Sequence, residues 1–461
     1  MKTVSERIGE FAYNLKLENI PKEVVERAKE MLLDFFAVAL AGLKARGSRE
    51  IAELAGRLGS GSASIIGFGF KTSTPYAALA NGTIAHAWDY DDTHSKAILH
   101  PTVVVAPAAL AVAEDRNLSG RDFLEAFIAG VEVDCKLGLS AKIGPLAIGY
   151  IYTALIGTFA AATASAKLLD LDSNGIARAI GVAYSLTSGN AEQLIEGTLC
   201  KRLQAGIAAM NGVLASLVAS SGFTSAREVF EGKFGFFNVY LRGEYDLKPV
   251  DELGVKYEIP YVSFKPYPCC RLTHTSIDAT LKLREKYNID VSNIEKVIVG
   301  VNKQAYNANA EPIEVKRRPR NIVDAQFSLP YVVSCALLYG RVGLSDFTPE
   351  AIKRSDVLKI AELVEPVIDE EIESRYGRVI SPARVTIILK DGSKYTEEVI
   401  YPLGEPENPM SRERLINKFI DAAEFSTILS RDEAEDMARE ILSIEKVTNI
   451  GELMNSLIKK S

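Results

Sequence analysis

The chain has 461 residues, of which 47% are hydrophobic and 25% charged, and its formal net charge is −7. This length predicts two domains, and the composition is typical of a globular protein with enough apolar surface for a core. The charges are interspersed, without a basic stripe or tail, so nucleic acid is excluded as an expected partner. Five cysteines without CxxC spacing and an N-terminus without a secretory signal favour a cytoplasmic location.

Up to about residue 264 the pattern is helical. Apolar residues recur at intervals of three and four after Pro21, a residue suited to a first helical turn. Further helices are predicted at 101–115, 121–138, 155–169, 174–187 and 201–221. The 24 uncharged residues of 143–166 could span a bilayer, but their Gly, Pro, Thr and Ala content favours a buried helix hairpin. We therefore expect no membrane partner.

The pattern changes after residue 264. Residues 294–301 are β-branched and alternating, and two similar runs in 383–403 flank Asp391-Gly392, a strong hairpin signal. Helices are predicted near 325–340 and 349–375. The chain is helical again after residue 402. We expect a mainly α fold, in which a large all-helical domain (1–264 plus 402–461) carries a smaller inserted α+β lid domain (265–401).

The stretch NGTIAHAWDYDDTHSKAILHP contains three of the four histidines of the chain. If a helix runs through Thr93, then His86, Asp89 and Thr93 share one face. Asp91 and Asp92 then point elsewhere, where they would cap or bond the loop backbone.

His100 precedes Pro101, which suits the first turn of another helix. The positive end of a helix dipole favours the neutral imidazole, so His100 is the best candidate for a general acid or base, with Asp89 expected to orient it. We expect His86 to be a hydrogen-bonded structural histidine. A metal site formed by His86, Asp89 and His94 is the rival interpretation, but neither an HExxH nor an EF-hand spacing is present, and we predict no metal.

Two further stretches supply cations. Lys201 and Arg202 begin a small-residue helix at the end where a cation opposes the dipole, so an anion is expected nearby. Prolines hold an extended segment that presents Lys265, and a helix from about residue 268 puts Cys270 and His274 on one face. This helix face is equally consistent with an ordinary hydrophobic core and with part of a functional site.

The blocks NGTIAHAWDYDDTH…HP, KRLQAG, FKPYPCCRLTH and DAQFSLPY resemble, in order, the signature blocks of the MmgE/PrpD family. The resemblance implies a homodimer whose subunit has a large helical domain and a smaller α+β lid. It also implies a pocket for small polycarboxylates at the domain junction, with no metal, iron–sulfur cluster or organic cofactor.

Carried over by residue, the resemblance assigns pocket positions to Asp89, Thr93, His100, Lys201, Lys265 and Tyr331. Cys270 lies where the decarboxylases of the family carry another histidine. Ile151 stands where many relatives have a histidine, which argues against cis-aconitate decarboxylation, and Gln204 also replaces a family histidine.

The shared chemistry of the family is proton transfer next to a carboxylate, where lysines stabilise the developing dianion. We expect a 2-methylcitrate or citrate-type dehydratase; the alternatives are an epimerase or decarboxylase of a related dicarboxylate and a silent anion-binding protein. The predicted catalytic residues are Asp89, His100, Lys201 and Lys265. The predicted substrate-binding residues are Thr93, Arg202, Cys270, His274 and Tyr331.

Overall fold

The structure is a computed structural model that describes residues 2–377 and 381–458. The chain divides into two compact units: unit 1 comprises Met1–Ser263 and Ser411–Ser461, and unit 2 comprises Phe264–Met410. The chain thus returns to unit 1 after residue 410, whereas we expected this return after residue 401.

Over its described residues, unit 1 has helices and one short antiparallel hairpin, β1 (Ala63–Ser64) and β2 (Lys71–Thr72). Its helices are α1 (Val4–Asn14), α2 (Lys22–Gly42), α3 (Ser48–Leu58), α4 (Thr74–Ala85), α5 (Thr102–Asp115), α6 (Gly120–Ser140), α7 (Tyr152–Leu155), α8 (Gly157–Leu168), α9 (Ser173–Leu186), α10 (Glu192–Ile195), α11 (Cys200–Ser220), α12 (Phe236–Val239), α13 (Lys248–Asp251), α21 (Arg412–Ser426), α22 (Arg431–Ile441) and α23 (Ile450–Ser456). The five long helices predicted between residues 101 and 221 are confirmed within a few residues.

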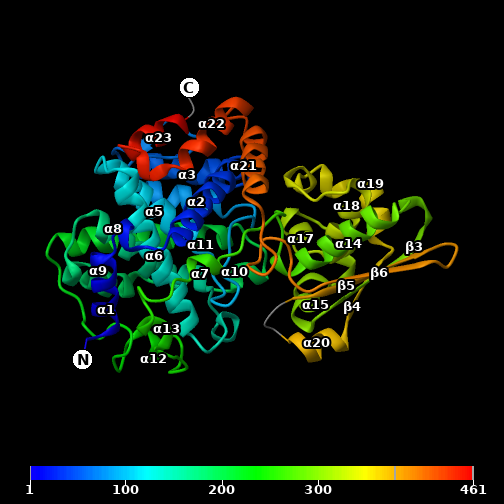
Figure 1. Ribbon diagram of the computed structural model, residues 1–461, viewed down its shortest axis with the longest axis horizontal. Coiled ribbons are helices and arrows are strands. Elements are labelled where there is room, and N and C mark those ends of the chain that lie inside the picture. Colours follow the sequence, from blue (N-terminus) through cyan, green and yellow to red (C-terminus); the bar gives the residue numbers. More distant parts are fainter. Residues whose placement is uncertain (1, 378–380, 459–461) are drawn as a thin grey trace. The chain divides into compact units, whose positions relative to one another are not determined.

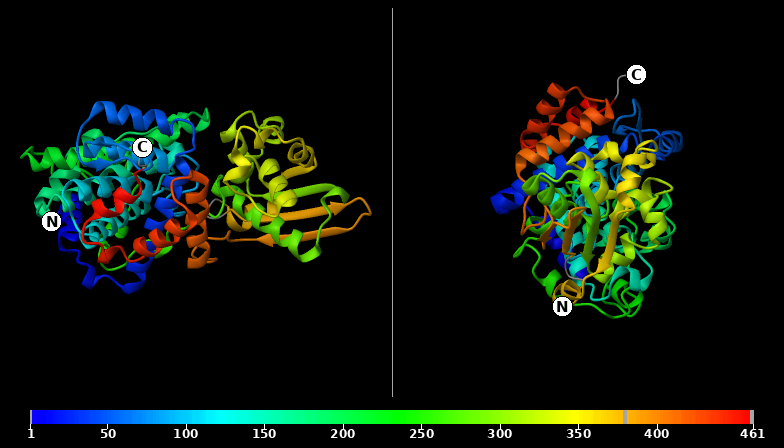
Figure 2. Two further views of the ribbon diagram at one scale, coloured as in Figure 1. Left: turned by 90° about the horizontal axis from the view of Figure 1, so that it is seen from above. Right: turned by 90° about the vertical axis from the view of Figure 1, so that its right-hand side faces the viewer.

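The C-terminal helices belong to unit 1, where α21 packs on α2 (Figures 1 and 2). A buried ion pair joins the two helices, with Lys418 Nζ 2.6 Å from Asp34 Oδ1. The same ammonium donates to the Tyr90 carbonyl over 2.8 Å. The C-terminal segment therefore contacts the irregular stretch that follows α4.

Helices α4 and α11 approach closely because small residues line their contact. A methyl group added at Gly206 would lie 2.2 Å from the Leu79 carbonyl oxygen and 2.3 Å from Thr83 Oγ1. A methyl group added at Gly82 would lie 3.0 Å from the Gly206 Cα atom. Only glycine therefore fits at this crossing, which lies one turn before the end of α4.

The uncharged segment 143–166 forms the single turn α7 and the buried helix α8 rather than a hairpin of two long helices. Among the described residues, α11 alone has the length and composition of a membrane span, and 56% of its most apolar stretch is buried inside the protein. Buried core helices have the same length and composition.

Unit 2 contains a four-stranded sheet in the order β4–β3–β5–β6. Its strands are β3 (Ile294–Val301), β4 (Val364–Ile368), β5 (Ala383–Leu389) and β6 (Lys394–Val399). Strand β3 pairs with β4 in parallel and with β5 antiparallel, and β5 and β6 form the hairpin predicted around Asp391-Gly392.

Helices α14 and α18 cover the sheet of unit 2 (Figure 1). The helices of this unit are α14 (His274–Tyr287), α15 (Lys303–Asn309), α16 (Ile313–Arg317), α17 (Ile322–Gln326), α18 (Leu329–Tyr339), α19 (Ser355–Ala361) and α20 (Glu370–Tyr376). Every second side chain of β3 from Val297 onward, at Val297, Val299 and Val301, is buried in the core of this unit. The same core contains Leu283 of α14 and Val333 of α18. This period of two is what the sequence of β3 predicts.

The prediction of a helix over 349–375 is wrong, because this segment contains α19, strand β4 and the start of α20. Pro366 lies in the middle of β4, where it lacks the N–H that a helix needs and is tolerated because β4 is an edge strand. The helix predicted at 325–340 is divided into α17 and α18 at Ser328, whose side chain caps α18 by accepting the Tyr331 N–H.

Candidate active site

Helix α4 ends at Ala85, so the helix through Thr93 that would put His86, Asp89 and Thr93 on one face does not form. Asp89 has a φ of 51°, a left-handed conformation that aspartate tolerates and a helix cannot contain. The buried Trp88 donates its indole N–H to the Ala41 carbonyl over 2.8 Å. Tertiary bonds of this kind stabilise an irregular segment where local periodicity predicts a helix.

Two histidines face one carboxylate oxygen in this segment. His86 Nδ1 and His100 Nδ1 each lie 2.9 Å from Asp91 Oδ2. The two imidazole rings are edge to face, with their centroids 5.0 Å apart. His86 and Asp91 are buried, whereas the His100 side chain is 19% exposed. Of these three residues, only His100 is partly open to solvent.

Lys201 connects the histidines with Asp89. Its ammonium donates to Asp89 Oδ1 over 2.7 Å and lies 3.0 Å from His86 Nε2. Lys201 is in the first turn of α11, where the helix dipole disfavours a cation. The anion expected near this helix start is therefore Asp89.

The charge states of the cluster follow from burial and mutual contact. Burial, together with the Lys201 charge, lowers the pKa of His86 to about 4 against the opposing effect of Asp91. Burial acts to raise the pKa of Asp91, but the imidazoles of His86 and His100 outweigh it and hold this pKa well below its usual range. At neutral pH the cluster therefore contains a neutral His86 and an ionised Asp91.

Asp91 takes the place that we expected for Asp89. It contacts His100, whereas Asp89 contacts Lys201. Sequence reasoning missed Asp91 because the predicted helix turned it away from His86 and His100. The spacing of residues within a loop carries no signal for such a contact.

The neighbours of Asp91 have separate roles. Asp92 accepts the Thr102 N–H over 3.4 Å and also bonds the Thr102 hydroxyl, so it caps the start of α5 as expected for a loop-bonding aspartate. Thr93 pairs its main chain with Ser263 in both directions, over 2.9 and 2.7 Å. Its hydroxyl is buried without a hydrogen bond within the described part of the chain.

His94 does not join the histidine cluster. Its Nδ1 accepts the Ala97 N–H over 3.1 Å, and its Nε2 lies 3.4 Å from Glu258 Oε2. The metal-ligand set that we weighed from the sequence, which included His94, therefore does not converge.

A different set of metal-binding atoms lies close together. Over the described residues, His86, Asp91 and His100 each offer one such atom, and these atoms lie within 4.8 Å of one another. Each imidazole already faces the carboxylate through Nδ1, so Asp91 has two protein groups beside it that can donate a hydrogen bond.

Arg202 and Gln204 lie in the first turns of α11, whereas Ile151 lies outside this helix. Burial lowers the pKa of Arg202, against the opposing charge of Asp89, and the Arg202 guanidinium has one long hydrogen bond of 3.4 Å to the Arg46 carbonyl. Gln204 bonds the main chain of Asn190 through both amide atoms. Ile151 is the N-cap of α7.

Lys265 lies in unit 2, on an irregular segment followed by bends at residues 266–269, and is 1% exposed. The preceding Phe264 donates its N–H to the Gly404 carbonyl over 3.1 Å. Gly404 has a φ of +93°, and a methyl group there would lie 2.1 Å from the Phe264 carbonyl oxygen. The segment that carries Lys265 is therefore held tightly against the 404 turn.

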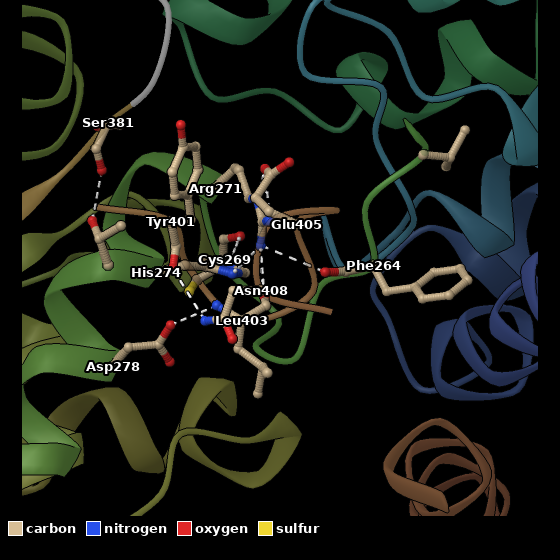
Figure 3. A network of polar contacts seen from close by, with 12 residues as sticks. Phe264, Cys269, Arg271, His274, Asp278, Ser381, Tyr401, Leu403, Glu405 and Asn408 are labelled. Carbon is tan, nitrogen blue, oxygen red and sulfur yellow. Dashed lines mark hydrogen bonds and ion pairs between the residues drawn. The ribbon is translucent and has the colours of Figure 1, made fainter. Parts of the chain in front are cut away.

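Arg271 is the centre of a polar network in unit 2 (Figure 3). Its guanidinium bonds Glu405 Oε1 at 2.7 and 3.1 Å and donates to His274 Nδ1 over 3.1 Å and to the Leu403 carbonyl over 3.2 Å. His274 Nε2 lies 3.2 Å from the Cys269 carbonyl. Both ring nitrogens of the fully buried His274 therefore face protein groups.

Cys270 and Tyr331 also lie within unit 2. Helix α14 starts at His274, later than the residue 268 that we predicted, so Cys270 precedes it and donates its N–H to the Gln326 carbonyl over 2.9 Å. The Tyr331 side chain is fully buried, and its hydroxyl donates to the Asp346 carbonyl.

A buried carboxylate between two imidazoles, beside a lysine ammonium, is a centre suited to proton transfer near an anion. The model of the MmgE/PrpD N-terminal domain matches residues 6–248, and the model of the MmgE/PrpD C-terminal domain matches residues 267–445. The chain belongs to the MmgE/PrpD family, as its motifs suggest.

Curated relatives cover nearly the whole chain. A cis-aconitate decarboxylase of Aspergillus terreus is 32% identical over 98% of this chain and 96% of its own length. A cis-aconitate decarboxylase of Homo sapiens is 26% identical over 100% and 95% of the two chains. A 2-methylcitrate dehydratase of Salmonella typhimurium is 24% identical over 88% and 87%.

Proposed function

We propose that this protein is a lyase that acts on a small polycarboxylate by proton transfer next to a carboxylate group. The observation that carries the proposal is the contact of Lys201 with both Asp89 and His86, within the cluster that also holds His100. The relatives support it, since they are named for reactions of cis-aconitate and 2-methylcitrate.

The residues of unit 1 have different roles in this proposal, which follow from their chemistry. The Lys201 ammonium stabilises the negative charge that develops beside a substrate carboxylate. His100 transfers the proton, because its ring is partly exposed and its Nδ1 faces Asp91. The unbonded Thr93 hydroxyl and the Arg202 guanidinium bind substrate oxygens. Lys265 is assigned by the resemblance alone.

We place decarboxylation of a substrate like cis-aconitate first, which reverses the order expected from the sequence. The relatives with the higher identity, over nearly the full chain, are cis-aconitate decarboxylases. In this reaction a C–C bond breaks, CO₂ leaves, the electron pair enters the carbon framework, and the framework takes up one proton.

Dehydration is the second candidate, supported by Ile151. The hydroxyl of Thr153, two residues after it, accepts the main-chain N–H of His100 over 3.1 Å. An apolar side chain therefore occurs near His100 where many relatives have a histidine. In a dehydration a C–H proton is removed and hydroxide leaves with a second proton as water.

NMR of substrate panels in D₂O tests the proposal. The purified protein is incubated with cis-aconitate, citrate, 2-methylcitrate and iminodisuccinate. Decarboxylation of cis-aconitate releases CO₂ and gives new vinyl signals. Dehydration releases no CO₂; it gives a vinyl signal from citrate, whereas from 2-methylcitrate it turns the methyl doublet into a singlet, because the new double bond carries no hydrogen. Epimerisation gives deuterium exchange alone. Shifts without turnover or exchange would identify a silent anion-binding protein and overturn the proposal.

Two controls sharpen this assay. Lys201→Met should abolish turnover, whereas Lys142→Met, on a lysine that is 51% exposed, should leave it unchanged. Turnover should also survive EDTA. Loss on chelation that one added metal ion restores would contradict the cofactor-free mechanism and assign His86, Asp91 and His100 as ligands.

A further inference from the structure

In each of the four histidines at least one ring nitrogen faces a named protein group. A backbone N–H, a guanidinium and an ammonium can only donate hydrogen bonds. A ring nitrogen that faces one of these groups must therefore accept, and the proton of the neutral ring lies on the other nitrogen. The tautomer of each neutral histidine follows from its partners.

His94 and His274 carry the proton on Nε2. His274 Nδ1 accepts from Arg271, so its Nε2–H points to the Cys269 carbonyl at 3.2 Å (Figure 3). His94 Nδ1 accepts the Ala97 N–H over 3.1 Å. These two rings share one tautomer.

His86 has the opposite tautomer. The Lys201 ammonium, held by the Asp89 carboxylate at 2.7 Å, donates to His86 Nε2 at 3.0 Å. The proton of this ring is therefore on Nδ1 and is donated to Asp91 Oδ2 over 2.9 Å.

Two unbonded atoms remain beside this pair. Asp91 Oδ1 and His100 Nδ1 are buried and have no hydrogen bond within the described part of the chain, although His100 Nδ1 is 2.9 Å from Oδ2 of the same carboxylate. Buried polar atoms of native proteins are nearly always paired. One is an acceptor and the other a potential donor, so a small rotation of the Asp91 carboxylate gives each imidazole its own oxygen.

We propose that Asp91 is a positioning residue that keeps His86 and His100 in the same tautomer, with the proton on Nδ1. His100 then presents Nε2 as its proton-transfer atom, and His86 leaves Nε2 to accept from Lys201. The role of His100 in turnover rests on the proposed function, but the tautomers do not.

The proton balance of the step is simple. When His100 Nε2 takes a substrate proton, the ring becomes an imidazolium that the Asp91 carboxylate stabilises, and Asp91 itself stays ionised. Return of that proton to carbon or to a leaving oxygen restores the neutral ring. One carboxylate thus orients the acid–base group and, through His86, the Lys201 ammonium.

Long-range ¹H–¹⁵N NMR of protein labelled only in histidine tests the tautomers without any substrate. Four rings give few signals, which single histidine substitutions assign. At a pH where all four are neutral, His86 and His100 should show the Nδ1–H pattern, and His94 and His274 the Nε2–H pattern. An Nε2–H pattern for His100 in the wild-type protein would overturn the proposal, whatever its activity.

Asp91→Asn provides the functional arm. An amide has one oxygen and one NH₂ group; His86 keeps the oxygen because Lys201 fixes its tautomer, so His100 faces the NH₂ group and changes to Nε2–H. We expect kcat to fall about 10²–10⁴-fold with little change in KM. A folded Asp91→Asn protein with wild-type tautomers and kcat would contradict the proposal.

Asp92→Asn is the matched control. Asp92 is equally buried and adjacent, but bonds Thr102 instead of a histidine. Burial, with the nearby charge of Asp34, raises its pKa well above the usual range, so an amide resembles its neutral form. This variant should keep the tautomers and the kcat. If the wild-type protein turns over no polycarboxylate, the proposed function fails, and the spectra still decide the tautomers.

Discussion

His100 and His86 differ in exposure and in partners, so their substitution should separate catalysis from stability. His100→Ala should lower kcat about 10²–10⁴-fold, the usual contribution of a general acid or base. Because its ring is partly exposed, the free energy of unfolding should change by no more than about 1 kcal/mol. Steady-state kinetics and thermal melts measure both, and a stable, fully active His100→Ala protein would exclude this residue as the catalyst.

His86→Ala is the companion variant. It leaves the buried Asp91 carboxylate and the Lys201 ammonium each without one partner, which costs about 1–3 kcal/mol for each unsatisfied group. We therefore expect a larger loss of stability than in His100→Ala. A His86→Ala protein of wild-type stability would contradict the contacts assigned to this ring.

The candidate site shows what a sequence can predict at this scale. The histidines, Asp89 and Lys201 could be singled out because their side-chain chemistry and segments are visible in the sequence. The role of Asp91 could not, because it depends on where α4 ends. Asp89 in a left-handed conformation and the tertiary bond of Trp88 end the helical pattern, and neither has a periodic signal.

At the scale of elements, helix α6 and the loop before Ser263 are joined by one buried carboxylate. Glu132 accepts the N–H of Glu258 at 2.8 and 2.9 Å and the N–H of Ile259 at 2.8 Å. Burial raises the pKa of Glu132 to about 7. Burial also acts to raise the pKa of Glu258, but contacts with His94 and Lys136 outweigh it and lower this pKa to about 2.

Glu132 should make unfolding depend on pH. Its pKa is higher in the folded chain than its ordinary value of 4.5, so its stabilising contribution is full below pH 4.5 and is lost as the pH rises through about 7. The full effect is on the order of 3 kcal/mol. When the pH is raised from 5 to 8, the free energy of unfolding of Glu132→Gln, measured by chemical denaturation, should therefore increase relative to that of the wild type. An equal difference at both pH values would show that this carboxylate does not titrate there.

Elements with a strong local pattern could be predicted well, and elements selected by tertiary pairing could not. The strand β3 and the hairpin around Asp391-Gly392 are confirmed because alternation and a glycine turn are local signals. Strand β4 was assigned to a helix, since five residues around Pro366 become a strand only beside β3. The predicted helix at 325–340 is interrupted at Ser328, the N-cap of α18, and a serine can be recognised as an N-cap only when the start of the helix is known.

For the whole molecule, we predict a homodimer, as the family resemblance implies. Unit 1 leaves large apolar side chains exposed, among them Ile195 (71%), Phe223 (67%) and Phe234 (75%), and such surface is unfavourable in water. Size-exclusion chromatography with light scattering should give about 100 kDa, twice the chain mass of 50.2 kDa. A mass of one chain at all micromolar concentrations would contradict the dimer.

The glycine crossing of α4 and α11 has a consequence for chemistry. His86 follows the end of α4 and Lys201 starts α11, so the spacing of these two helices sets the 3.0 Å contact between the two side chains. Gly206→Ala would place a methyl group 2.2 Å from a backbone oxygen, and the helices would have to separate. We expect about 1–3 kcal/mol less stability and a loss of kcat out of proportion to it, whereas Gly144→Ala, in open space, should change neither. A Gly206→Ala protein that is destabilised but keeps the wild-type kcat would contradict the connection between helix spacing and catalysis. In this protein a residue without a functional group sets the distance between the lysine and a histidine of the candidate site, and a screen confined to polar side chains would not find it.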